Sequence, residues 1–547
     1  MLSIRPFLYF ASLSTGMGAA MLGGGSLEAQ SVRPGDPTTS YVRALSLTGA
    51  DFGTTFTVLP GTDLSGPARE EQIPETRAHP WWERPYPAYG TAPSSGALAL
   101  SVDEARVRTV LNSAVPRGWN DGAMWAGRGV TSSFDARASA RWRGLAVVAN
   151  PTVVFNQNRS YELATVLPPN QPPWAYPWRV VDWPQRFGPD SFWTLDPGDS
   201  RVSLDWKSGR VSVGNESLWW GPGVRNAIVM SNNAPGFLHA ALSTNEPVDI
   251  GIGRLEGKWI WGGLGESDYF DPSAPSDRFI TGIVLAYSPD WLAGLTVGGT
   301  RVFQTHVPDA GLPASEYLLV AQGFLKVGQV SDQQPDGSDR RDQILSLFAR
   351  WAFPESGAEV YVEWARTDHA LDLEDFLQEP EHSQGYTLGL QKVTSKSTQR
   401  MFLLSAELTH LEASTTFQLR PRPTYYTNSA VTQGYTHKGQ ILGAWVGPGG
   451  NSQFVGLEMF AAWGSVEMFV QRQVHDNDAF WVWAEANNQT FDAHHVSFDL
   501  GVDAMVFRGE VELGGGAVIT RQINRWFYGP HLWNFNLSLA ARWRPGA

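Results

Sequence analysis

The feature that most constrains the fold is an alternation of apolar and polar side chains over segments of about ten residues. Along residues 496–506 every second residue is apolar, and those between are Ser497, Asp499, Gly501, Asp503 and Met505. The same phase recurs at residues 359–364, 404–409, 455–459 and 465–471. In a transmembrane β-barrel, successive side chains face lipid and lumen in turn. The pattern therefore indicates strands with an apolar outer face and a polar inner face.

A soluble β-sandwich alternates in the same way, so the number and context of the segments decide between the two folds. Strand candidates continue almost to the C-terminus, where Phe535, Leu537, Leu539, Ala541 and Trp543 share one face. No segment after the N-terminal leader has about eighteen uninterrupted apolar residues, so a membrane-spanning form must be a closed barrel. We therefore predict an all-β, transmembrane, antiparallel outer-membrane barrel.

Composition supports strands and excludes several kinds of chemistry. The chain has 56 Gly, 36 Pro and 24 Trp, which favours strands, tight turns and interfacial aromatic rings. It has no cysteine, which excludes disulfides, zinc-thiolate sites and cysteine nucleophiles. A net charge of -13 without a long Lys/Arg run argues against a nucleic-acid partner. A neutral or acidic glycan remains compatible with this charge where local Arg or Trp residues contact it.

The N-terminus has the order of a secretory signal peptide. Arg5 precedes an apolar stretch that reaches Leu22, and small residues then lead to a cleavage point near Ala29. The alternative is a membrane-anchor helix, which Ser12, Ser14 and several glycines disfavour. We predict that residues 1–29 are a signal peptide.

The connections between strand candidates alternate in length, as they do in bacterial barrels. Short connections fall near residues 288–290, 354–357, 394–399, 461–464 and 508–509. Long ones fall at residues 306–342, 368–383, 412–452, 475–494 and 521–531. This order requires residues 440–445 to lie in a loop or inward fold. Between residues 201 and 261 the order of the strands stays open.

Two segments rich in proline and aromatic residues differ from the strands. We predict that residues 30–126, with a brief strand signal at residues 41–47, form a periplasmic or lumen-filling segment, and that the barrel occupies residues 127–547. Residues 168–197 contain Trp174, Trp178, Trp183 and Trp193 and are interpreted as an inward-folded loop or plug. If this apolar segment were exposed at the surface, it would form a large apolar patch.

The strand phase also places charged side chains in the lumen. Mixed charges there either form networks in a closed lumen or line a water-filled eyelet, and the bulky inserts favour the closed form. The predicted inward residues are Asp205, Glu359, Glu363, Glu407, Glu458, Glu467, Asp499, Asp503, Glu510, Glu512, Arg137, Arg141, Arg350 and Arg542.

One motif resembles a known family. Ser-Leu-Trp-Trp-Gly-Pro-Gly at residues 217–223, continuing to residue 237, resembles the signature stretch of the Wzi family of capsule-assembly outer-membrane proteins. Residues 120–129, 359–369, 406–409 and 435–443 resemble further blocks of that family in the same order. The resemblance implies a barrel of about eighteen strands with a plugged lumen. It also implies a protein that holds capsular or extracellular polysaccharide at the cell surface.

Two groups of aromatic residues are candidates for contact with sugar. Aromatic faces suit the C–H faces of sugar rings, and we predict polysaccharide contacts in loops expected to be extracellular, at Tyr425, Tyr426, Trp481 and Trp483. The signature residues are interpreted as structural, in an interfacial ring or a turn packed into the wall, with a sugar-stacking platform as the alternative; they are Trp219, Trp220, Gly221, Pro222 and Gly223.

Nothing in the sequence indicates catalysis. There is no Gly-x-Ser-x-Gly, Walker or His-Glu-x-x-His motif. Glu359 and Glu363 would lie about 13 Å apart on a strand, beyond the spacing of glycosidase carboxylates. We therefore predict no catalytic residue, no metal and no cofactor. An enzyme acting on lipid or glycan is disfavoured by the missing nucleophile pattern.

The sequence thus predicts a non-enzymatic protein that attaches or organises capsular or extracellular polysaccharide at the cell surface. The expected partners are that polysaccharide and outer-membrane lipid, with no nucleic acid, and the barrel is expected to be a monomer. The alternative is a porin or substrate-specific channel, which would differ in conducting through its lumen.

Overall fold

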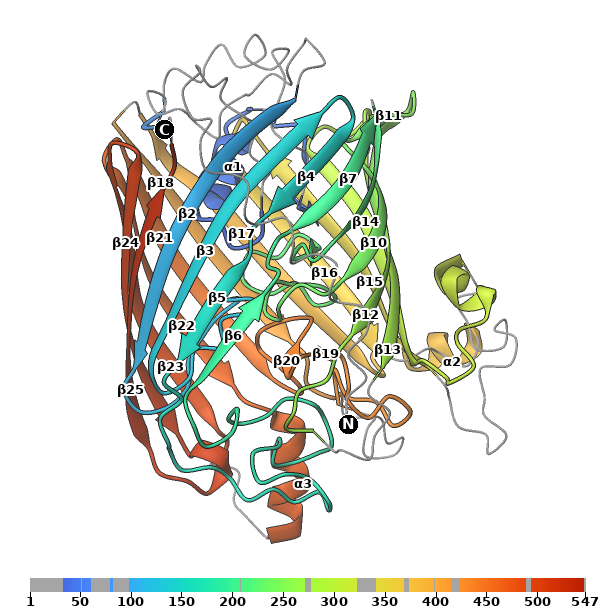
Figure 1. The fold of residues 1–547 in the computed structure, drawn as a ribbon, viewed down its shortest axis with the longest axis vertical. Coiled ribbons are helices and arrows are strands. Elements are labelled where there is room, and N and C mark those ends of the chain that lie inside the picture. The colour runs from blue at the N-terminus through green and yellow to red at the C-terminus, as the bar shows by residue number, and fades with distance from the viewer. Residues whose placement is uncertain are drawn as a thin grey trace.

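The computed structural model describes residues 33–50, 52–60, 79–81, 98–206, 208–270, 277–321, 341–367, 373–397, 399–414, 424–487 and 493–545. Within these residues the wall is a closed antiparallel barrel of 18 strands (Figure 1), which confirms the predicted fold class. No helix in the same ranges is long and apolar enough to cross a membrane.

The wall runs in sequence order and closes where β25 pairs with β2. β4 and β5 together form one span, as do β6 and β7, and the short β11 extends the turn before β12. The wall strands are β2 (Ala99–Asn112), β3 (Gly129–Trp142), β4 (Leu145–Ala149), β5 (Thr152–Asn156), β6 (Phe192–Asp196), β7 (Arg201–Trp206), β8 (Gly209–Gly214), β10 (His239–Thr244), β11 (Val248–Asp249), β12 (Gly253–Leu264), β13 (Arg278–Pro289), β14 (Leu295–His306), β15 (Arg341–Phe353), β16 (Ala358–Thr367), β17 (Gln384–Lys396), β18 (Arg400–His410), β21 (Asn451–Ala461), β22 (Gly464–Val474), β23 (Val496–Arg508), β24 (Val511–Ile523) and β25 (Leu532–Trp543).

Shorter elements lie inside the barrel or in its connections. The two-residue strands are β1 (Val58–Leu59), β9 (Trp219–Trp220), β19 (Thr436–His437) and β20 (Gln440–Ile441). The helices are α1 (Pro37–Ser46), α2 (Leu373–Gln378) and α3 (Asn477–Asn487), with short 3-10 helices at Ala314–Ala321 and Arg525–Phe527.

The alternation along the wall strands confirms the predicted phase. On β23, Phe498 and Leu500 are 46% and 58% exposed on the outer face, whereas Ser497 and Asp499 are buried on the inner face. Exposed tryptophans gather near the ends of the strands, as in the aromatic girdles of outer-membrane barrels. At the end that carries the short turns they are Trp142, Trp206, Trp291, Trp351, Trp463 and Trp543.

The two ends of the barrel differ. At the turn end the strands are joined by short connections, such as residues 354–357, 462–463 and 509–510; at the loop end they are joined by long ones. Figure 1 shows α1 and the C-terminus at the turn end and α3 at the loop end. Bacterial barrels keep short turns in the periplasm and long loops outside the cell, which orients the chain. Residues 440–445 lie in a loop, as predicted, and begin with β20 of the β19–β20 hairpin.

The predicted start of the barrel at residue 127 is wrong. β2 already belongs to the wall, where it pairs with both β3 and β25. The register shifts between Val102 and Glu104, and this irregularity interrupts the two-residue alternation. Glu104, Arg106 and Arg108 also make the segment unusually polar, so the strand lacked a clear apolar face in the sequence. The predicted signal peptide lies outside the described residues.

The strand signal at residues 41–47 was also wrong, because this segment lies in α1 and its C-terminal cap. Asp36 caps the helix by accepting a hydrogen bond from the Thr38 backbone nitrogen, and Pro37 occupies the first turn. Tyr41, Ala44 and Leu45 then share one helix face and are fully or almost fully buried.

The lumen holds a packed apolar core, which confirms the predicted plug. Toward the turn end, Tyr41 of α1 stacks on Trp81 with ring centroids 4.0 Å apart, and both belong to a cluster with Phe460 and Phe507 of the wall. A second cluster joins wall side chains to residues of the long connections, including Trp220, Ile228, Tyr425, Tyr426 and Leu442. The inserts therefore form a packed hydrophobic core inside the barrel, like the core of a soluble domain.

The Pro/Trp-rich segment at residues 168–197 contributes only in part to this filling. Trp183 packs against the second cluster, and Trp178 packs against a smaller cluster beside α3. Trp193, however, lies on β6 and is 70% exposed on the outer face. The final residues of the predicted insert therefore belong to the wall.

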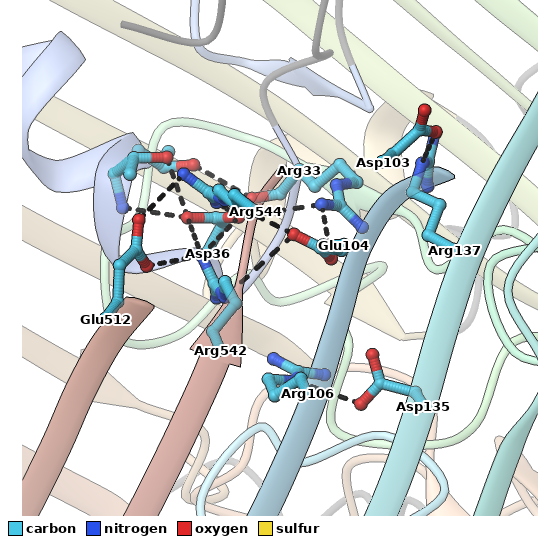
Figure 2. A network of polar contacts seen from close by, with 12 residues as sticks. Arg33, Asp36, Asp103, Glu104, Arg106, Asp135, Arg137, Glu512, Arg542 and Arg544 are labelled. Atoms are coloured by element: carbon cyan, nitrogen blue, oxygen red, sulfur yellow. Dashed lines mark hydrogen bonds and ion pairs between the residues drawn. The ribbon is translucent and has the colours of Figure 1, made fainter. Parts of the chain in front are cut away.

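An ion-pair network joins the segment before α1 to the seam of the barrel (Figure 2). Asp36 lies 3.3 Å from Arg542 and 3.2 Å from Arg544, and Arg33 lies 2.9 Å from Glu104 on β2. Burial raises the pKa of Asp36, but the guanidinium groups of Arg542, Arg544 and Arg33 outweigh it and hold that pKa well below its usual range. The seam and the N-terminal segment therefore stabilise each other.

Replacing Asp36 with Asn should loosen α1. Asn still caps a helix, so the substitution removes the charge that faces the arginines and largely spares the cap. Breaking a buried pair costs about 3 to 5 kcal/mol. We expect faster amide hydrogen exchange across residues 37–46, measured by mass spectrometry on the refolded protein. Asp290→Asn, at an exposed turn residue, is the control, and equal exchange in both variants would contradict the role given to the network.

Candidate functional site

The signature segment lies inside the lumen. Its two tryptophans form β9, which pairs with β1 through Val58↔Trp220 and Leu59↔Trp219. Trp219 is 6% exposed and Trp220 is fully buried, so neither reaches the membrane interface or a sugar. The Trp219 indole nitrogen donates to the Gly223 carbonyl oxygen at 3.0 Å, which folds the segment back on itself.

Gly221 allows a wall carboxylate to approach this segment. Its φ of +111° is a conformation that side-chain-bearing residues rarely adopt. A Cβ at this position would lie 3.0 Å from a carboxylate oxygen of Glu363. The same carboxylate accepts a hydrogen bond from the Ile228 backbone nitrogen at 3.0 Å.

Glu407 of β18 holds the turn that follows. Its carboxylate accepts hydrogen bonds from the backbone nitrogens of Val224, Arg225 and Asn226 at 2.7, 3.1 and 2.8 Å. Tyr361 of β16 donates to the same carboxylate at 2.8 Å. The wall thus supplies acceptors for backbone donors that have no strand partner.

Glu359 links this segment to α1. Arg43 of α1 and Arg350 of β15 donate to its carboxylate at 2.8 and 2.7 Å. Arg43 also donates to the Pro222 carbonyl oxygen at 2.8 Å. Glu359, Glu363 and Glu407 therefore anchor the N-terminal segment and the signature segment to one side of the wall.

The prediction that Tyr425 and Tyr426 contact polysaccharide is wrong, because both side chains are fully buried. The Tyr426 hydroxyl donates to the Ile228 carbonyl oxygen at 2.7 Å and accepts from the Ala444 backbone nitrogen at 2.8 Å. Loop aromatics pack within the plug here because the loop between β18 and β21 folds inward.

Trp481 and Trp483 lie on α3 at the loop end. Trp481 is 37% exposed. Trp483 is partly buried, with its ring 5.7 Å from that of Phe527 and 6.0 Å from that of Tyr528. α3 thus presents one tryptophan outward and uses the other to hold the connection between β24 and β25.

A cavity of about 230 Å³ lies at the loop end, beside the plug. Its walls come from the ends of β22 to β25 and from the inward-folded connections. The aromatic side chains lining it are Trp119, Trp125, Tyr161, Tyr176, Trp183, Trp445 and Trp526. The amides lining it are Asn120, Gln185, Asn233, Gln440, Gln473, Gln522 and Asn534. Aromatic faces among amide groups suit a ligand with apolar ring faces and many hydroxyl groups.

The sequence did not predict this cavity. Its residues come from widely separated segments; the Pro/Trp-rich insert and the family blocks at residues 120–129, 217–237 and 435–443 gave a signal in the sequence, but nothing indicated that they meet. The remaining lining residues are single amides and aromatics at strand ends, which are brought together only by the folding of the loops.

Two histidines line the same cavity. The His475 and His495 rings stack with centroids 4.1 Å apart, and the His475 ring nitrogen Nε2 lies 2.7 Å from the Ser497 hydroxyl. Burial lowers the pKa of His475 to about 4. Burial, and then the neighbouring His475, lower the pKa of His495 well below its usual range. Both rings are therefore neutral near neutral pH. Among the described residues, no group of three or more His, Asp or Glu side chains could hold a metal ion.

A closed, plugged barrel with outward-facing aromatic girdles defines an outer-membrane protein. Residues 120–490, more than half of the chain, match the family of the capsule assembly protein Wzi. The chain belongs to this family, and it is located in the bacterial outer membrane.

One solved structure agrees with the fold. The Escherichia coli outer-membrane protein Wzi, described as a carbohydrate-binding β-barrel involved in group 1 capsule assembly, has a TM-score of 0.59 at 11% identity. The match covers 93% of this chain and 98% of that one. Acinetobacter baumannii OccAB1 has a TM-score of 0.40 at 7% identity, over 81% of this chain and 96% of that one. No curated protein matches the chain in sequence.

Replacing Glu407 with Ala should loosen the plug. Its carboxylate serves three backbone donors, and hydrogen bonds to charged groups contribute roughly 1.5 to 3 kcal/mol each. We expect flickering ion currents in planar bilayers, because the signature segment can then leave the wall. Glu355→Ala, at an exposed residue of a short turn, should stay as silent as the unchanged protein. Silent bilayers for both variants would argue against this anchoring role.

Acidification should destabilise the part of the loop end around the cavity where His475 and His495 stack. Unfolded histidine titrates near pH 6.5, whereas folded His475 resists protonation down to a pKa of about 4. The stability from neutral His475 is therefore complete above about pH 6.5 and is lost progressively toward about pH 4, by roughly 3 kcal/mol in total. We expect near-ultraviolet circular dichroism of the aromatic residues to weaken over this range. The double variant His475→Gln/His495→Gln should show a flat profile, and an equally flat profile for the unchanged protein would contradict the prediction.

Proposed function

We propose that this protein attaches or organises capsular or extracellular polysaccharide at the cell surface, and that it does so without catalysis. The observation that carries this proposal is the pairing of a filled lumen with an aromatic, amide-rich cavity at the loop end. In the described part of the chain, packed side chains occupy the lumen through which transport would have to run, whereas the cavity offers the groups that bind sugars. Membership of a capsule-assembly family points the same way.

The size of the cavity suggests how a polymer would be held. Sites for drug-sized ligands commonly occupy roughly 300 to 1,000 Å³. At about 230 Å³, this cavity would accommodate one sugar unit of a chain and leave the neighbouring units outside. Trp481 on α3 is our candidate for contact with such neighbouring units, with Trp483 as its support.

A porin or substrate-specific channel is the alternative function. It would require a continuous aqueous path, yet two apolar clusters fill the lumen and contain fully buried Tyr41, Trp220, Tyr425 and Tyr426. We therefore favour surface attachment over conduction.

Deleting the gene should release polysaccharide from the cells. We expect the cell-bound fraction to fall several-fold and the fraction in the medium to rise by a matching amount, because synthesis continues while retention is lost. The measurement is uronic-acid and neutral-sugar content of washed cells and of culture supernatant. Unchanged retention would refute the proposal.

Variants expressed in the deletion strain refine this test. Trp481→Ala should restore retention only in part, because it removes an exposed ring at the loop end. Trp291→Ala removes a 70% exposed ring beside a turn at the opposite end and should restore retention fully. Equal rescue by both would remove Trp481 from the contact surface.

A further inference from the structure

One charged side chain of the cavity, Arg525, forms no close ion pair among the described residues, although the Glu162 carboxylate is near enough to act on its pKa. Arg117 pairs with Asp499 at 2.8 Å, and Asp121 pairs with Arg108. Arg525 also lines the cavity, but it forms no ion pair with any carboxylate of the described residues. Its hydrogen bond runs from Nη1 to the backbone carbonyl oxygen of Glu162, at 2.8 Å.

Arg525 is buried and packs against two aromatic rings. It is 7% exposed, and its guanidinium carbon lies 5.3 Å from the centroid of the Tyr161 ring and 5.2 Å from that of the Trp526 ring. A guanidinium has five N–H donors in a planar fork, so most of its capacity is unused here. A buried charge is costly unless it is paired, and burial lowers the pKa of Arg525.

Other polar atoms of the cavity also lack partners. Among the described residues, the Trp526 indole nitrogen has no hydrogen-bond acceptor and the Asn120 side-chain oxygen has no donor. Both residues line the cavity.

The backbone around Arg525 has a strained conformation that turns both Arg525 and Trp526 toward the cavity. Asn524, Trp526 and Phe527 have φ values of 50°, 58° and 73°, a region that costs non-glycine residues free energy. The strain is maintained by packing, since the Phe527 ring stacks on Trp178 with centroids 4.9 Å apart. The result is that Arg525 and Trp526, adjacent in sequence, both face the cavity.

We propose that the cavity binds a sugar unit that bears a carboxylate, and that this carboxylate pairs with the guanidinium fork of Arg525. The proposal rests on the polysaccharide-binding function proposed above and adds the chemical class of the sugar. Planar carboxylates match the guanidinium fork in a bidentate geometry, whereas a neutral sugar would leave the guanidinium without a carboxylate in contact. Arg525 thus provides the positive charge for an acidic glycan within a chain of net charge -13.

The test compares two probes that differ only at C6. Methyl glucuronide and methyl glucoside are titrated into the full-length protein in detergent, and binding is measured by calorimetry. We expect the glucuronide to bind at least tenfold more tightly. Arg525→Gln should abolish this preference, and Arg525→Lys should reduce it, because lysine keeps the charge but not the fork.

Arg521→Gln is the matched control. Arg521 lies four residues before Arg525, near the end of β24, but its guanidinium covers the Trp533 ring, on the outer face, at 5.0 Å. Heat-modifiable migration in gels establishes that each variant is folded. Equal binding of both probes, binding of neither, or a preference that survives Arg525→Gln would overturn the inference. Such results would refute only the binding of an acidic sugar at Arg525. The proposed function is tested separately by the retention assay, and it would be refuted if the deletion strain kept its polysaccharide.

Discussion

The structure depends on buried wall carboxylates that accept hydrogen bonds from irregular backbone inside the barrel. Backbone at membrane depth must find partners within the protein, since lipid offers none. The strands satisfy one another, but the signature segment has few backbone partners: the two-residue β1–β9 pairing, a bridge from Trp220 to Met230, and single backbone hydrogen bonds such as that from the Gly221 nitrogen to the Thr57 carbonyl oxygen. Glu407 supplies three of the missing acceptor contacts and Glu363 a fourth. Without these carboxylates the plug would contain unpaired donors, each costing about 1 to 3 kcal/mol.

This constraint explains why the charges in the lumen do not line a pore. Glu359, Glu363 and Glu407 point inward, as in a porin, yet they are 4% exposed or less. Each faces a guanidinium or a backbone nitrogen of the plug rather than water. The inward charge therefore serves to fix the inserts, and the two ends of the barrel are separated by a packed core.

Much of the wall could be predicted from the sequence. Strands that face lipid on one side alternate apolar and polar residues, and this alternation can be read without knowing which residues are in contact. The alternation did not identify strands where the wall is irregular. β2 carries a register shift, and β8 and β10 are only 6 residues each. Glu510 was placed in the lumen by the phase of β24, but it lies in the turn before that strand, where its carboxylate accepts from the Trp543 indole nitrogen at 3.0 Å. A turn ends the alternation, so phase cannot be extended through it.

The inserts could be recognised from the sequence, but their arrangement inside the barrel could not be predicted from it. Apolar composition indicated that the Pro/Trp-rich segment must be covered, and the motif at residues 217–223 stood out by its pattern. Nothing local distinguishes Tyr425, which is fully buried, from Trp481, which is 37% exposed, because both are aromatics in long connections. Which of them is covered depends on whether the connection folds inward, and that is decided by distant partners such as the Ile228 carbonyl oxygen that binds Tyr426.

The plug and the cavity are parts of one hydrogen-bonded unit. The Arg225 guanidinium carbon lies 3.4 Å from the centroid of the Trp119 ring, and the Arg225 carbonyl oxygen accepts from the Asn120 side chain at 2.9 Å. Asn232 donates in turn to the Asn120 carbonyl oxygen at 2.9 Å. Trp119 and Asn120 line the cavity, while the Arg225 backbone nitrogen is held by Glu407. The carboxylate that anchors the signature segment therefore also fixes one wall of the sugar-sized cavity. This accounts for a binding surface built on a plugged barrel, since loops alone would not hold these side chains in place.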